Sequence, residues 1–387
     1  MRLRELGTVL EEIRQREQFR QVRDLRLVTA TRGLDRQGRE YLVFHSNDYL
    51  GMTHEPLVQR AAREALAWGT GSGGARLTSG APFELSELEG ALASFKHTED
   101  AVIFGTGYMT NLGVLYGLCG REDVIFSDAL NHASIIDGCR IVRARVVVYP
   151  HGDLEALERL LQKTECPGQR FVVTDNVFSM DGDVADLSGL LRLRDKYGAC
   201  LITDDAHGVG VIGKTGRGLA EYWGCPGADI QVGTLSKALG AEGGYAAASR
   251  EICDALRNLS RPFIFSTALG PATGAAALKA LELLQAAPKR YVGRLQENAR
   301  YMREKLAAAG LPVLPGETPI LPVVLGDEGR TLAFAKACQE AGLLLSAIRP
   351  PTVAPGSSRI RLTVTAAHSR EELDWAAEVM GREYMQI

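Results

Sequence analysis

The sequence has few of the features that mark a disulfide framework, a metal site or a nucleic-acid-binding surface. Its seven cysteines form no C-x-x-C pair, and their number is odd. This pattern is typical of reduced thiols, so it predicts a cytoplasmic protein without a metal site. The net charge is only −3 and no long basic run occurs, so we expect neither nucleic acid nor a membrane surface as a partner.

Long apolar runs are also missing. The first seven residues, Met-Arg-Leu-Arg-Glu-Leu-Gly, lead into a charged amphipathic segment and lack the apolar core of a signal peptide. The uncharged stretch 101–120 contains five glycines, two threonines and an asparagine, which favours a buried strand, loop and helix over a membrane span. With 45% hydrophobic and 24% charged residues, the 387-residue chain has the composition of an ordinary soluble globular protein.

Short β-branched runs alternate with helical periods along most of the chain. This alternation predicts an α/β fold in which a mostly parallel, seven-stranded sheet is covered by helices on both faces. The expected strands are Ala101–Phe104, Val124–Ser127, Arg145–Tyr149, Phe171–Thr174, Cys200–Thr203, Ile230–Gly233 and Gly244–Ala248. The expected helices include 84–96, 109–119, 153–163, 186–197 and 271–287.

The pattern divides the chain into three parts. We expect an N-terminal helical arm over 1–45, with one helix over roughly 1–28, and a large domain over 46–289. A smaller C-terminal α/β domain is expected over 290–387. Its predicted helices are 290–309, 328–341 and 369–382, and its predicted strands are 319–325, 343–348 and 358–364.

Polar residues follow most of the strands of the predicted sheet. In open parallel sheets, ligands bind beyond the carboxyl ends of the strands. The first such segment, Gly105-Thr-Gly107-Tyr108, precedes a helix whose free amides would hold a phosphate. The others are Asp128–His132, Asp175–Gly182, Asp204–His207 and Thr234–Lys237. Their common position predicts a single site for an anionic heteroaromatic ligand.

Lys237 and Asp204 carry the chemistry of this predicted site. A lysine that forms an imine and a carboxylate that meets a pyridinium nitrogen are what pyridoxal phosphate chemistry requires. Taken alone, Lys237 would be a solvated loop lysine and Asp204 a helix cap. Because Asp204 and Asp205 must point to opposite faces of the sheet, only one of them can meet the ring. His207 could reach the phenolic oxygen, and His132 could lie flat on the ring or be a core histidine.

Two motifs suggest other functions. Gly208-Val-Gly-Val-Ile-Gly-Lys-Thr215 matches the phosphate-loop pattern of ATPases. That pattern needs a helix directly after the lysine, and Thr215-Gly-Arg-Gly218 opposes one. Gly105-x-Gly107 followed by Asp128 partly matches a dinucleotide fingerprint, but Thr110 stands where a small third residue belongs. Both alternatives leave the remaining polar cluster unexplained.

From about Ser46 to His368 the chain resembles the α-oxoamine synthases, a family of fold-type I pyridoxal phosphate enzymes. The motifs are Ser46-Asn-Asp-Tyr-Leu-Gly51, Gly71-Ser-Gly-Gly74, Val177-Phe-Ser-Met-Asp-Gly182, Asp204-Asp-Ala-His-Gly208 and Gly233-Thr-Leu-Ser-Lys237. The resemblance implies that Lys237 forms the Schiff base, Asp204 meets the pyridine nitrogen, His207 bonds the ring hydroxyl and His132 stacks on the ring. The further cofactor contacts that it implies are Gly107, Tyr108, Ser179, Thr234 and Thr267. The substrate-binding residues that it implies are Asn47, His132, Arg349, Thr352 and either Arg20 or Arg23, with Arg20 as the candidate.

The resemblance also implies a substrate pair and an assembly. Members of this family condense a small amino acid with an acyl thioester and release carbon dioxide. Ala347–Val353 and Ser358–Thr363 resemble the members that join L-alanine to a pimeloyl thioester in biotin biosynthesis, with glycine and acetyl-CoA as the alternative pair. Delivery by coenzyme A or by a carrier protein stays open. A homodimer is expected, with Gly69–Gly80 and Ser266-Thr267 contributing across the interface.

Overall fold

The computed structural model describes residues 3–16 and 18–387. The chain forms two compact units, which we name by their content. The sheet unit comprises Asn47–Ser179 and Asp183–Leu295. The terminal unit comprises Met1–Ser46, Met180–Gly182 and Gln296–Ile387, so it combines both ends of the chain with a short internal segment.

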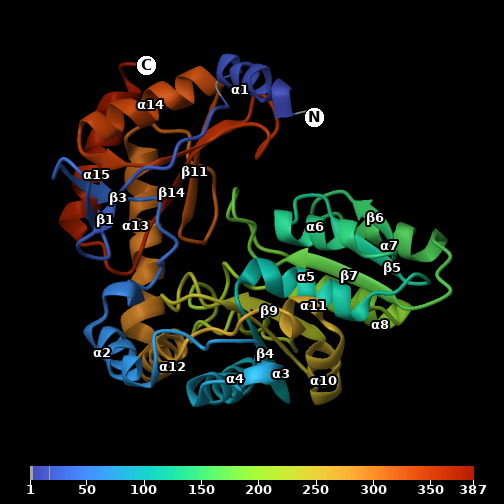
Figure 1. The fold of residues 1–387 in the computed structure, drawn as a ribbon. Helices are drawn as coiled ribbons and strands as arrows, with labels where there is room; N and C mark the ends of the chain where they lie inside the picture. Colours follow the sequence, from blue (N-terminus) through green and yellow to red (C-terminus); the bar gives the residue numbers. More distant parts are fainter. Residues whose placement is uncertain (1–2, 17) are drawn as a thin grey trace. The chain divides into compact units, whose positions relative to one another are not determined.

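The sheet unit contains a seven-stranded sheet in the order β4-β10-β9-β8-β7-β5-β6 (Figure 1). Its strands are β4 (Asp100–Phe104), β5 (Val124–Asp128), β6 (Arg145–Tyr149), β7 (Arg170–Asp175), β8 (Cys200–Asp204), β9 (Ile230–Thr234) and β10 (Gly244–Ala248). β10 is antiparallel to β4 and β9, and the other pairs are parallel. All seven predicted strands and the mostly parallel α/β sheet are confirmed.

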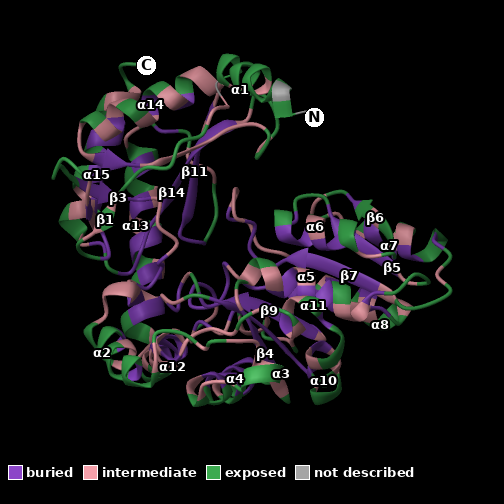
Figure 2. Ribbon diagram, viewed as in Figure 1, coloured by how far each residue is buried: buried purple, intermediate pink, exposed green. Residues whose placement is uncertain are grey.

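Apolar strands explain why this sheet is covered on both faces. Every residue of β5, β9 and β10 is buried, whereas the edge strand β6 is largely exposed (Figure 2). Helices lie on both sides of the sheet, with α4 and α5 on opposite sides in Figure 1. The helices of the unit are α2 (Pro56–Ala65), α3 (Arg76–Ser79), α4 (Phe83–Lys96), α5 (Gly107–Leu118), α6 (Ala133–Ile141), α7 (Leu154–Lys163), α8 (Leu187–Tyr197), α9 (Leu219–Trp223), α10 (Arg250–Leu259), α11 (Arg261–Ile264) and α12 (Pro271–Ala286).

The terminal unit contains two small sheets. One has the order β1-β2-β3-β12, with β1 (Arg26–Leu27), β2 (Arg32–Leu34), β3 (Glu40–Val43) and β12 (Leu343–Leu344). The other has the order β11-β14-β13, with β11 (Ile320–Gly326), β13 (Ser346–Ile348) and β14 (Ser358–Thr363). The helices of the unit are α1 (Leu6–Gln15), α13 (Arg294–Ala308, entering from the sheet unit), α14 (Glu328–Glu340) and α15 (Arg370–Tyr384). Phe44, Leu321, Phe334 and Ile360 lie in its core.

Two predictions for the terminal unit are wrong. The N-terminal helix was expected over roughly 1–28, but α1 ends at Gln15, and Arg26–Leu27 pairs with Gly33–Leu34 as a strand; residues 1, 2 and 17 of the prediction lie outside the described residues. α1 has no buried residue, so no tertiary packing extends it. The single strand expected over 343–348 is two strands, because β12 pairs with β3 and β13 pairs with β14.

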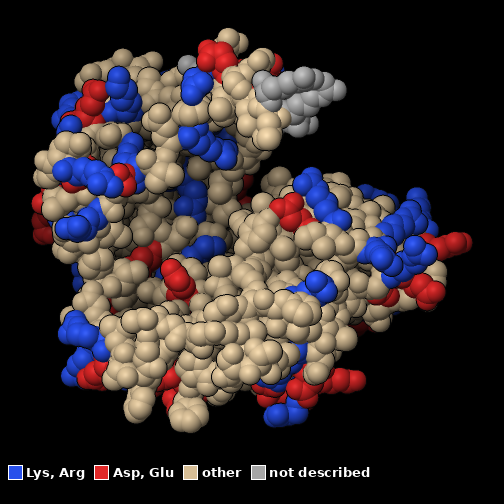
Figure 3. Space-filling model, in the orientation of Figure 1, with Lys and Arg blue, Asp and Glu red and all other residues tan. Residues whose placement is uncertain are grey.

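Three further features of the described residues concern surface charge, helix length and groups of possible metal ligands. Lys and Arg side chains are interspersed with Asp and Glu side chains on the face drawn in Figure 3. Within the described part of the chain, we find no helix with the length and apolar character needed to cross a membrane. The described residues also contain no group of three or more His, Cys, Asp or Glu side chains that could hold a metal ion.

Candidate active site

A pocket of about 250 Å³ lies in the sheet unit, at the carboxyl ends of β4, β5, β7, β8 and β9. Eight of the residues that the sequence singled out line it together: Gly107, Tyr108, His132, Ser179, Asp204, His207, Thr234 and Lys237. The other lining residues are Thr106, Asn111, Ser134, Asp175, Ala206 and Ser236. The parallel strands therefore bring together side chains that are up to 131 positions apart in the sequence (Thr106 to Lys237).

The first turn of α5 forms one wall of the pocket. Thr106 caps the helix, and its hydroxyl oxygen accepts a hydrogen bond from the Met109 amide. The amides of Gly107 and Tyr108, in the first turn, have no carbonyl partner within the helix. Gly107 approaches its neighbours closely, because an added Cβ would lie 3.2 Å from the Thr234 side chain. This helix start offers the backbone donors and the positive dipole end that bind a phosphate group.

Asp204 presents a carboxylate held in place by two donors. The Asn111 side-chain amide donates to Oδ2 at 2.6 Å, and the Ala206 backbone amide donates to Oδ1 at 2.9 Å. The next residue, Asp205, does not line the pocket; its carboxylate pairs with Lys96 Nζ of α4 at 2.7 Å. The two neighbouring aspartates thus point to opposite faces of the sheet, as strand alternation requires.

Lys237 and His207 form a basic pair in the pocket. Lys237 Nζ lies 2.8 Å from His207 Nε2. The other ring nitrogen of His207, Nδ1, lies 2.6 Å from the Tyr49 hydroxyl, which in turn donates to Asn47 Oδ1 at 3.5 Å. The histidine ring is therefore fixed from both sides, and Asn47 joins the pocket through Tyr49 without lining it.

His132 is exposed at the start of α6, where it lines the pocket. Its Nδ1 lies 2.8 Å from Ser134 Oγ, and its backbone amide donates to Asp175 Oδ2 at 2.7 Å. Partial burial lowers the pKa of His132 and nearby Lys237 lowers it further, against the opposing effect of Asp204. A neutral ring on the pocket wall fits stacking on a flat ligand better than a place in the core.

The remaining predicted residues lie outside this pocket. Thr267 is exposed and lines a separate, smaller pocket of the sheet unit. Arg20, Arg349 and Thr352 belong to the terminal unit. There, Arg20 Nη2 donates to Thr352 Oγ1 at 3.4 Å, and Arg349 Nη2 donates to the Phe19 carbonyl at 3.1 Å. The N-terminal segment therefore contacts the 349–352 loop within that unit.

Comparison with known proteins assigns the family. The family model described as aminotransferase class I and II matches residues 39–380. The chain belongs to this family. An 8-amino-7-oxononanoate synthase from Citrifermentans bemidjiense is 47% identical over 96% of both chains. 8-Amino-7-oxononanoate synthase 2 of Bacillus subtilis is 48% identical over 87% of this chain and 86% of the other.

A solved structure gives the same result for the fold. A single-residue variant of serine palmitoyltransferase from S. paucimobilis, solved with a bound PLP–myriocin aldimine, superposes with a TM-score of 0.92 at 30% identity, covering 98% of this chain and 97% of the other. These findings confirm the predicted resemblance to the α-oxoamine synthases and the fold-type I architecture. The 208–215 segment also lacks the structure of an ATPase phosphate loop, because no helix follows Lys214 until Leu219.

The pocket of this family member fits pyridoxal phosphate in its donor set. It combines a helix start for a phosphate, a fixed carboxylate for a ring nitrogen, a neutral histidine on its wall and a lysine amine. Asn111, Ser134, Asp175 and Ser236 received no role from the sequence. One signal was available: Asn111 stands four residues after Gly107, so both lie on one helical face.

Proposed function

We propose that this chain catalyses the decarboxylative condensation of L-alanine with a pimeloyl thioester. The products are 8-amino-7-oxononanoate, carbon dioxide and a free thiol, and the reaction belongs to biotin biosynthesis. The observation that carries this conclusion is the 47% identity, over 96% of both chains, to an 8-amino-7-oxononanoate synthase. The Lys237–His207 pair and the Asp204 carboxylate in one pocket provide the groups that such a reaction needs.

Pyridoxal phosphate is the cofactor, and the pocket residues divide its binding among them. When bound, it supplies an electron sink that stabilises the carbanion formed at Cα of the amino acid. The α5 amides of Gly107 and Tyr108 would bind its phosphate, with Ser179 and Thr234 nearby. Asp204 would keep the ring nitrogen protonated, since an adjacent negative charge favours the protonated ring.

Lys237 is the residue that transfers the Cα proton of alanine. Its amine accepts the proton from Cα of alanine and later returns one to that carbon. His207, at 2.8 Å from Nζ, orients the amine and is itself held by Tyr49. His132 confines the ligand from the pocket wall, where its ring is fixed by Ser134.

Arg20 is the better of the two N-terminal candidates for binding a substrate carboxylate. It contacts Thr352, which the sequence also assigned to substrate binding, whereas Arg23 donates to Gln339 at 2.7 Å. Arg349 contacts the same N-terminal segment, because it donates to the carbonyl of Phe19, the residue before Arg20. The contact between Arg20 and Thr352 supports a shared role for these residues.

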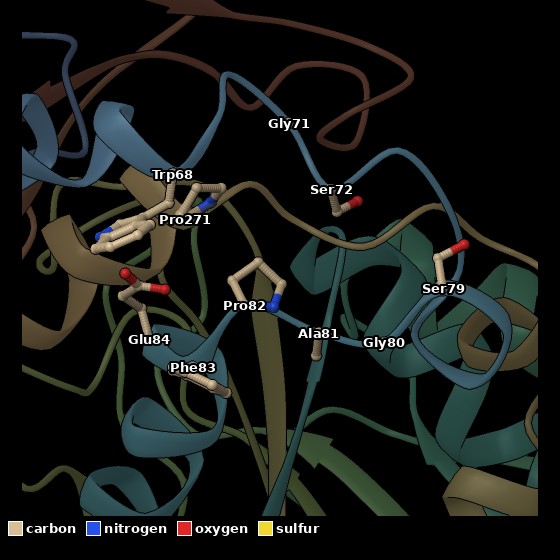
Figure 4. Close-up of a pocket in the computed structure, with 10 residues that line it drawn as sticks. All are labelled: Trp68, Gly71, Ser72, Ser79, Gly80, Ala81, Pro82, Phe83, Glu84 and Pro271. Carbon is tan, nitrogen blue, oxygen red and sulfur yellow. The ribbon is translucent and has the colours of Figure 1, made fainter.

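An apolar surface of the sheet unit supports a homodimer. Trp68 is 78% exposed and Phe83 is 84% exposed, which is unusual for large apolar side chains. Both line a pocket of about 400 Å³ together with Pro82 and Pro271 (Figure 4). A second copy of the chain is the partner that we propose for this surface, and a cytoplasmic location fits the seven free cysteines. A monomeric active species in sedimentation equilibrium would contradict the dimer.

The reaction is tested by thiol release from the PLP-loaded protein, over a matched grid of amino acids and acyl-CoAs. L-Alanine with pimeloyl-CoA should give the fastest release. Lys237→Ala should slow it by about 10²-fold or more, because the proton-transferring group is lost. Lys214→Ala is the matched control: this lysine is exposed in the phosphate-loop-like segment, and its loss should leave the rate unchanged.

Two results would change the proposal. Equal or faster release with glycine and acetyl-CoA would move the assignment to a glycine acetyltransferase or a broad-specificity member of the family. Full activity of Lys237→Ala would remove the assigned role of that lysine.

A further inference from the structure

The pocket contains a second carboxyl group, Asp175, which the proposed reaction leaves without a role. Asp175 ends β7, and Asp204 ends the neighbouring parallel strand β8, where the two residues are register partners. Asp175 is 6% exposed and lines the same pocket as Asp204. Two acidic side chains therefore stand side by side at the end of the sheet, beneath a site that needs one negative charge.

Hydrogen bonds connect the two carboxyl groups through three residues. Asp175 Oδ2 accepts the His132 backbone amide at 2.7 Å, and His132 Nδ1 lies 2.8 Å from Ser134 Oγ. Asn111 Nδ2 donates to Ser134 Oγ at 2.9 Å and to Asp204 Oδ2 at 2.6 Å. The wall histidine and the ring-facing carboxylate are thus held by one network, of which Asp175 is the other end.

Neighbouring buried carboxyl groups do not both ionise readily, because like charges in a poorly solvated site repel. Asp204 accepts hydrogen bonds from both Asn111 and Ala206, and donors of this kind stabilise the charged form of a carboxyl group. Asp175 is bonded by the His132 amide. Burial raises the pKa of Asp175 well above its ordinary value, and the charge of Asp204 raises it further. The His132 amide and Lys237 oppose this rise with smaller effects, and Asp128 adds the smallest increase.

We propose that Asp175 is a positioning residue of the cofactor site, which in its uncharged form fixes His132 and leaves the negative charge of the pair on Asp204. This inference rests on the proposed function for its purpose, since the charge on Asp204 serves the cofactor. The uncharged state of Asp175 is nevertheless a property of the protein without its cofactor. An asparagine is nearly isosteric with a protonated aspartate and is also uncharged, so it should replace Asp175.

The experiment compares Asp175→Asn with Asp175→Ala. In spectroscopic titration of the apoprotein with pyridoxal phosphate, Asp175→Asn should bind within about threefold of the wild type, and Asp175→Ala about tenfold or more weakly. The alanine variant leaves the His132 amide without its acceptor, which costs about the free energy of one partly buried hydrogen bond. The absorption spectrum of the bound cofactor should match the wild type in the asparagine variant.

A second readout uses the apoprotein without any cofactor. When folding raises the pKa of a carboxyl group, the protein loses stability as the pH rises from the pKa of the unfolded chain toward the pKa of the folded one. Asp175→Asn removes that loss, so the variant should unfold at the same or a higher temperature than the wild type at about pH 8. The difference should narrow as the pH is lowered toward about 5.

Asp128→Asn is the matched control, since Asp128 also ends a strand of this sheet. Its Oδ1 accepts from the Leu130 amide and its Oδ2 from the Gly152 amide, so an asparagine there could accept only one of the two bonds. The same substitution there should lower the unfolding temperature.

Each outcome separates the inference from the proposed function. If Asp175→Asn destabilises the apoprotein at about pH 8 as much as Asp175→Ala does, Asp175 needs its charge and the inference is wrong. The same holds if both variants bind pyridoxal phosphate equally weakly while the wild type binds it. If the wild type binds no pyridoxal phosphate, the proposed function fails, and the apoprotein comparison still decides the state of Asp175.

Discussion

The buried ion pair between Lys96 and Asp205 gives the sharpest prediction about stability. Both side chains are 1% exposed, and Lys96 Nζ lies 2.7 Å from Asp205 Oδ2. Lys96 also donates to the Arg217 carbonyl at 2.7 Å. Two glycines leave space for the carboxylate, because a Cβ added to Gly208 or to Gly218 would lie 1.9 Å from one of its oxygens. The pair is therefore enclosed, with little room for water to replace a missing partner.

Removing one partner should cost far more than removing both. Lys96→Met leaves the Asp205 carboxylate buried without its cation, which typically costs about 3–5 kcal/mol of unfolding free energy. The double variant Lys96→Met/Asp205→Asn removes both charges. Both variants lose the bond to the Arg217 carbonyl, and the buried amide introduced by Asp205→Asn keeps a polar cost of about 1–3 kcal/mol in the double variant. We therefore expect the second substitution to restore about 2 kcal/mol.

Urea unfolding of the apoprotein, followed by circular dichroism, measures these differences. Comparing the two single variants with the double variant isolates the interaction between Lys96 and Asp205. A loss below about 1 kcal/mol in Lys96→Met would show that the carboxylate is solvated after all. A double variant no more stable than Lys96→Met would refute the reasoning, since the isolated charge would then not be the cause.

Two histidines give opposite pH dependences. Hydrogen bonds to Asp128 and Asp183, against partial burial, raise the pKa of His151 from 6.5 to about 10, so its contribution to stability should be lost between these values as the pH rises. The melting temperature of His151→Gln should accordingly fall less than that of the wild type over this range. Burial lowers the pKa of His368, which stacks on Phe44 at 4.1 Å, from 6.5 to about 4. The wild type should lose up to about 3 kcal/mol as the pH falls through this interval, and a melting series with His368→Gln, which cannot take up the proton, should lack that slope.

Much of the sheet unit could be predicted because its strands are marked by short, local sequence patterns. Strands such as β5 and β7 contain the apolar runs Val124–Phe126 and Phe171–Val173, which indicate burial on both faces. Parallel strands end at one edge of the sheet, so the sequence alone predicts one site that contains Asp204, Thr234 and the start of α5. The N-terminal helix was overestimated for the opposite reason. The helix ends at Gln15 and buries no residue, whereas Arg26–Leu27 pairs with β2, a contact with a later segment that no local pattern specifies.

Local pattern and residue type are sufficient to predict the fold class, the cofactor chemistry and the residues at the strand ends. The side chains that hold those residues in place are known only from the folded chain. Asn111, Ser134 and Asp175 lie on α5, α6 and β7. They hold the site through contacts of 2.6–2.8 Å, which exist only when these elements pack together. Such contacts join elements distant in the sequence, and no periodicity along the chain specifies them.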